Sequence, residues 1–97
     1  MNRKDILQDL KVLETEFKNT HKISFLLEGP IEENTLEKLR RDLHVLLRKI
    51  DIIKNKLEDN YDEDIIKKDM TDLYNTYEIV DIAMAKIINI VLDRKNI

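Results

Sequence analysis

Apolar residues recur along two long stretches of the chain at alternating steps of three and four residues. The first stretch contains Leu36, Leu39, Leu43, Leu46, Ile50, Ile53 and Leu57. The second contains Ile66, Met70, Leu73, Tyr77, Val80, Met84, Ile87 and Val91. This heptad spacing keeps one stripe of a helix facing a partner helix for about six turns or more. It predicts two long helices, over about 35–58 and 63–94, that pack against each other.

A shorter run of the same pattern lies near the N-terminus. It consists of Ile6, Leu10, Leu13 and Phe17. The pattern weakens at Thr20, and Asn2 is a typical residue for the N-terminal cap of a helix. We therefore predict a first helix over about 3–28, with a stutter or short break near 19–21.

Two short segments separate the three predicted helices. Gly29 and Pro30 form the strongest helix breaker in the chain, and Asn34 is a suitable cap for the second helix. The acidic run 58–64 forms the second turn. Short connections between long helices make neighbours antiparallel. The sequence thus predicts an all-α fold with a single domain over 1–97, an elongated, coiled-coil-like three-helix bundle running up, down and up.

Composition narrows the cellular compartments in which this bundle is expected. The 97 residues contain no cysteine, which excludes a disulfide framework and thiolate metal sites and fits a cytoplasmic protein. The N-terminus has no apolar signal-peptide core. The densest apolar stretch, 79–92, is shorter than the roughly 20 residues that span a bilayer, so we predict no membrane insertion.

Charge is distributed unevenly over the helices. Seven bases and three acids lie between Leu36 and Leu57, whereas ten acids and five bases follow from Glu58 onward. In one interpretation, a basic second helix pairs with an acidic third helix along their flanks, which sets the register. In the alternative, a basic face binds phosphates in a nucleic-acid-associated regulator. That face would consist of Arg40, Arg41, Arg48, Lys49, Lys54 and Lys56.

The residues that usually carry catalysis or bind metals are sparse. His21 and His44 belong to no Glu-x-x-His signature and are not spaced as two zinc ligands on one helix. The acidic segment 58–64 has Glu63 where a calcium-binding EF-hand loop needs glycine. We predict no enzyme activity, no cofactor and no catalytic or metal-binding residues.

The third predicted helix has more apolar residues than a packing stripe requires. Between Ile79 and Leu92, eleven of fourteen residues are apolar. In an up-down-up bundle this end lies beside the end of the first helix, which is also rich in apolar residues. Either segment 23–31 folds over a well-packed pole, or some apolar surface remains free for a partner. The residues predicted for such a partner-binding surface are Phe25, Leu26, Ile82, Ile88, Ile90 and Leu92.

These observations favour a non-enzymatic protein–protein interaction module. It would dock a partner helix, or a second copy in a homodimer, on an apolar pole formed by the first and third helices. A small adaptor, chaperone, immunity protein, inhibitor or other regulator would all suit this description. The pattern does not rank these roles.

Overall fold

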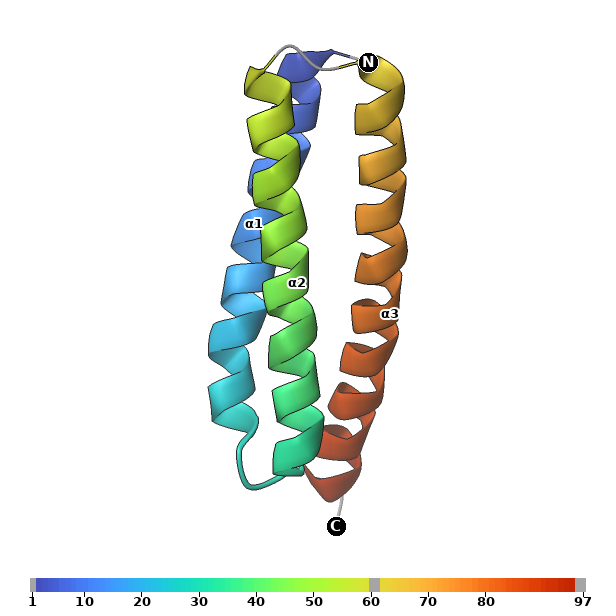
Figure 1. The fold of residues 1–97 in the computed structure, drawn as a ribbon. Coiled ribbons are helices and arrows are strands. Elements are labelled where there is room, and N and C mark those ends of the chain that lie inside the picture. The colour runs from blue at the N-terminus through green and yellow to red at the C-terminus, as the bar shows by residue number, and fades with distance from the viewer. Residues whose placement is uncertain (1, 60–61, 96–97) are drawn as a thin grey trace.

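Three α-helices run side by side along a rod in the computed structural model, which describes residues 2–59 and 62–95, with side chains through Asp93 (Figure 1). The helices are α1 (Arg3–Ser24), α2 (Glu33–Glu58) and α3 (Glu63–Lys95), with a short 3₁₀ turn, η1 (Phe25–Leu27), after α1. The rod measures 54 × 18 × 17 Å. In Figure 1, α1 and α3 run down the page and α2 runs up. The predicted all-α, antiparallel three-helix bundle is confirmed.

The heptad residues form the core. All seven ladder residues of α2 are buried, as are Ile6, Leu10 and Phe17 of α1. On α3 five ladder residues are buried, while Tyr77, Met84 and Val91 are half-buried and pack against the core. The buried residues of the α3 ladder are Ile66, Met70, Leu73, Val80 and Ile87.

The second helix is the central one. It packs closely against both α1 and α3, whereas α1 and α3 approach each other less closely. An aromatic contact joins α1 and α3: the ring centroids of Phe17 and Tyr77 lie 5.3 Å apart. The Tyr77 hydroxyl donates a hydrogen bond to Glu16 Oε1 at 2.5 Å, which raises the pKa of Tyr77 to about 12.

The first helix differs from its prediction at two places. It ends at Ser24 and not near residue 28, and the break expected near 19–21 is wrong because the helix is continuous there. The Thr20 hydroxyl donates to the Glu16 carbonyl one turn earlier, so its polar group is satisfied without interrupting the helix. At the start of the helix, the Asn2 side chain accepts a hydrogen bond from the Lys4 amide at 3.0 Å, which confirms the predicted cap.

The connection between α1 and α2 turns at Gly29, as predicted. Its φ of 98° lies in the left-handed region, where glycine carries no steric penalty. Ile31 then inserts into the core, and α2 begins two residues later at Glu33. Asn34 is therefore not the cap: Glu32 occupies that position and makes no side-chain capping bond. Residues 60–61 of the other predicted turn lie outside the described residues.

The length and hydropathy of the helices agree with the predicted absence of membrane insertion. Across residues 2–59 and 62–95, no helix has both the length and the apolar character needed to cross a bilayer.

Candidate protein-binding groove

An open groove of about 560 Å³ lies between the start of α2 and the second half of α3. We call it the α2/α3 groove. Buried Leu39 and Ile87 are part of its lining, and Ile79, Ile82 and Ile90 of α3 line it with large exposed surfaces. These three isoleucines are 62%, 53% and 43% exposed. Three large apolar side chains are thus concentrated at one opening.

The groove follows from a second apolar stripe on α3, displaced from the heptad ladder. Ile79, Ala83 and Ile90 are separated by four and seven residues, so they lie on the same side of the helix. That side faces α2, since the same residues line the groove together with α2 side chains. Ala83 is small, which leaves room in the middle of the stripe.

Three charged side chains also line the groove: Lys38 and Asp42 from α2, and Lys86 from α3. None of them makes an ion pair with another described residue. Farther along the same two helices, charged side chains form ion pairs between α2 and α3. Lys49 pairs with Asp72 at 2.5 Å. Lys56 pairs with Asp69 at 2.6 Å. The expected pairing of basic α2 with acidic α3 is confirmed for these residues, and it stops before the groove.

All six predicted partner-binding residues are exposed, and two of them line the α2/α3 groove. Ile82 and Ile90 line the groove, whereas Ile88 and Leu92 of the same helix do not. Leu26 is 81% exposed on η1. The guanidinium carbon of Arg40 lies over the Phe25 ring, 4.1 Å from its centroid. Ile79 was missed, although its spacing from Ala83 and Ile90 signals a shared face.

The second wall of the groove also differs from the prediction. We expected the apolar pole to lie between the first and third helices, but the groove lies between α2 and α3. The central position of α2 explains this: the Ile79–Ile90 side of α3 faces α2 and not α1. Segment 23–31 does not cover the groove, because Ile31 turns into the core and Ile82 and Ile90 remain exposed.

The basic face of α2 is largely engaged within the chain. Lys49 and Lys56 pair with α3, Lys54 pairs with Glu14 of α1, and Arg40 pairs with Glu28. The other two predicted phosphate-binding residues, Arg41 and Arg48, are exposed and form no ion pair with the described residues. Phosphate binding by the whole face would therefore require four existing ion pairs to open.

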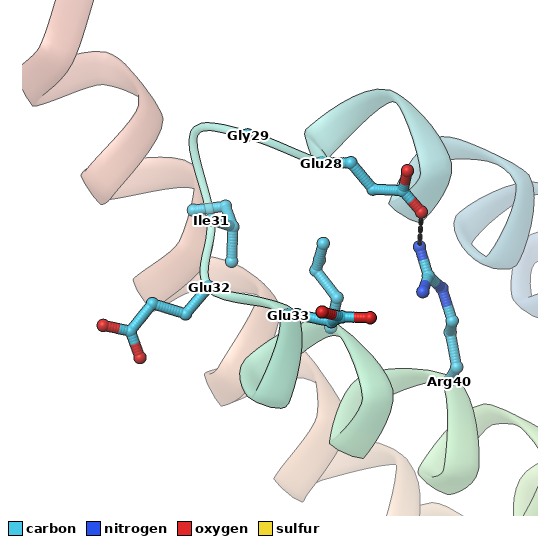
Figure 2. A pocket seen from close by; sticks show the side chains of 7 residues that line it. Glu28, Gly29, Ile31, Glu32, Glu33 and Arg40 are labelled. Atoms are coloured by element: carbon cyan, nitrogen blue, oxygen red, sulfur yellow. Dashed lines mark hydrogen bonds and ion pairs between the residues drawn. The ribbon is translucent and has the colours of Figure 1, made fainter.

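A second pocket, of about 440 Å³, lies where α1 connects to α2 (Figure 2). Its lining includes Glu28, Glu32, Glu33 and Arg40. A terminal nitrogen of Arg40 lies 3.0 Å from Glu28 Oε1. Figure 2 shows Glu28 pointing at Arg40 while Glu32 points away from it. Among the described residues, no group of three or more His, Cys, Asp or Glu side chains is arranged to hold a metal ion. The charged pair holds the connection in place.

Glu14 provides a test of the ion pairs between helices. A hydrogen bond from Lys18, and then one from Lys54 of α2, lowers the pKa of the Glu14 carboxyl from 4.5 to about 2. A carboxyl with a lowered pKa stabilises the fold above its unfolded-state pKa, and this contribution is lost as pH falls through the folded-state pKa.

We expect Glu14→Gln to lower the free energy of unfolding at neutral pH by less than about 1 kcal/mol. The difference from the unsubstituted chain should persist down to about pH 4.5 and shrink as pH falls toward 2, because the unsubstituted carboxyl of the folded chain becomes protonated around its pKa of about 2. Urea unfolding followed by circular dichroism at several pH values measures both proteins. A difference that does not change with pH would show that the Glu14 charge is not responsible.

Comparison with known proteins yields no match of significance to a family model, to a curated protein or to a solved structure. A function therefore has to be inferred from the surface of the bundle. In the α2/α3 groove, exposed apolar side chains lie beside charged side chains that form no ion pair with the described residues.

Proposed function

We propose that this chain is a non-enzymatic protein–protein interaction module that binds an amphipathic helix in the α2/α3 groove. One observation carries the proposal: Ile79, Ile82 and Ile90 lie together, about half exposed, in a groove whose lining includes core side chains. Contiguous apolar surface on a water-facing protein marks a site of interaction. A role as adaptor, chaperone, immunity protein or inhibitor would use such a site in the same way.

The shape of the groove favours a helical ligand. From Ile79 to Ile90 the stripe covers eleven helical steps, or about 16 Å, which is roughly three turns. A helix that lies in such a groove presents apolar residues at spacings of three, four and seven. Covering the exposed half of one isoleucine contributes about 1 kcal/mol, so these three side chains together supply roughly 3 kcal/mol.

The test is affinity capture from the native cells, with partners quantified by mass spectrometry. We expect Ile79→Ser/Ile82→Ser to reduce partner capture by about tenfold or more, because two apolar contacts are lost. The matched control is Ile88→Ser/Leu92→Ser, which changes two comparably exposed side chains of α3 that do not line the groove. Circular dichroism verifies that both variants stay folded.

Two outcomes would contradict the proposal. Equal capture by the groove variant and the control variant would show that the groove is not the site. Capture that falls steeply with added salt and contains nucleic acid would instead point to phosphate binding by α2, since contacts to phosphates weaken with salt and apolar docking does so far less.

A further inference from the structure

We infer that the helix bound in the groove belongs to a second copy of this chain, with the two α3 helices packed antiparallel about a two-fold axis. Each α3 then lies in the α2/α3 groove of the other copy. The inference rests on the proposed function, because it names the occupant of the same groove. Surface area, symmetry and charge each support it.

The first argument is surface area. The chain exposes 6991 Å². A compact monomer of 11.6 kDa exposes roughly 5,800 Å². The excess of about 1,200 Å² reflects the 54 × 18 × 17 Å rod. A standard protein interface buries about 800 Å² on each partner. A single interface along the rod would therefore remove most of the excess.

The second argument is symmetry. A two-fold interface brings a surface against itself, so the surface must be self-complementary. The apolar stripe is bounded by Ile79 and Ile90, and its midpoint lies between residues 84 and 85. An antiparallel pairing about this midpoint sets Ile79 opposite Ile90 of the second copy. It also sets small Ala83 opposite long Lys86, so that a gap meets a projecting side chain.

The third argument is charge. Asp42 and Ala83 line the same groove. Lys86 of the second copy, packed over Ala83, therefore has its ammonium within reach of Asp42, and symmetry forms this ion pair twice. Both groups make no ion pair with described residues of their own copy. A groove with charges of one sign would repel its own copy, whereas this one carries both signs.

The deciding experiment measures the mass of purified full-length variants by sedimentation equilibrium at micromolar to submillimolar concentration. We expect the unsubstituted chain to sediment as a dimer. Lys86→Glu and Asp42→Lys should each raise the dimer dissociation constant by about tenfold or more, since each places like charges together twice. An equimolar mixture of the two variants should regain the dimer. In the mixed dimer the introduced glutamate of one copy meets the introduced lysine of the other, and the native pair of Lys86 with Asp42 forms on the other side.

Cysteine cross-linking locates the interface directly, because the chain contains no cysteine of its own. Ala83→Cys should form a disulfide-linked dimer under mild oxidation. The matched control, Ala85→Cys, lies two residues away, exposed and outside the groove lining, and should form no disulfide-linked dimer under the same conditions.

The outcomes separate this inference from the proposed function. A strictly monomeric unsubstituted chain overturns the inference, and if Ile79→Ser/Ile82→Ser still abolishes capture of a different protein, the groove keeps its function with another occupant. A dimer that survives both charge substitutions, with equal cross-linking at residues 83 and 85, overturns the inference by placing the interface elsewhere. If the groove substitutions change neither association nor capture, both ideas are wrong.

Discussion

Replacing Leu46 with alanine is expected to lower the free energy of unfolding by about 2–5 kcal/mol. Leu46 is 0% exposed and belongs to the ladder of α2, the helix that packs on both neighbours. Removing its side chain therefore leaves a cavity that neither α1 nor α3 closes without losing its own contacts. Domains of this size are stabilised by about 5–15 kcal/mol in total, so one such change removes a large share of the stability.

The matched control for this prediction is Ile52→Ala on the same helix. Ile52 is 45% exposed and lies off the ladder, so its truncation should cost less than about 1 kcal/mol. Urea unfolding followed by circular dichroism measures both variants, at one protein concentration because dimerisation would add to the apparent stability. Equal losses for the two variants would mean that the ladder of α2 is not the centre of the core.

The core was predictable because heptad spacing is a local property of the chain. Every ladder residue from Leu36 to Leu57 is buried, since a stripe of this regularity has one low-energy orientation toward its neighbours. Helix ends depend on weaker local signals. The break expected near Thr20 is wrong because the Thr20 hydroxyl donates to the Glu16 carbonyl within a continuous helix. The cap expected at Asn34 is wrong because Ile31 is buried and α2 begins before Asn34.

The location of the groove was only partly predictable. The surplus of apolar residues in α3 identified Ile82 and Ile90, yet periodicity alone does not say which neighbour flanks each side of a helix. Three antiparallel helices can be arranged with either handedness, and the ladder residues point inward in both. Only the three-dimensional arrangement shows that the Ile79–Ile90 side of α3 faces α2.

Arg40 makes contacts that no periodic pattern predicts. Its Nε donates to Ser24 Oγ at 2.9 Å, and a terminal nitrogen donates to the Ser24 carbonyl at 3.2 Å. Ser24 is fully buried at the end of α1. The guanidinium also pairs with Glu28 and lies over the Phe25 ring. One side chain of α2 thus holds the end of α1, η1 and the residue before the Gly29 turn.

We expect Arg40→Leu to lower the free energy of unfolding by about 1.5–3 kcal/mol, because hydrogen bonds to a charged donor are lost and buried Ser24 loses a partner. Leucine keeps part of the apolar stem, so the loss reports mainly on the guanidinium.

The effect of Arg40→Leu should also be local. The Ile31 amide, which donates to the Leu27 carbonyl, should exchange its hydrogen faster, while amides near Leu46 should change only in proportion to global stability. Arg41→Leu is the control, since the neighbouring Arg41 is exposed and makes no ion pair with the part of the chain that the structure describes. Urea unfolding and hydrogen exchange measured by NMR give the two readouts. If Arg40→Leu behaved like Arg41→Leu in both, the α1–α2 connection would be held by Ile31 and the Gly29 turn alone.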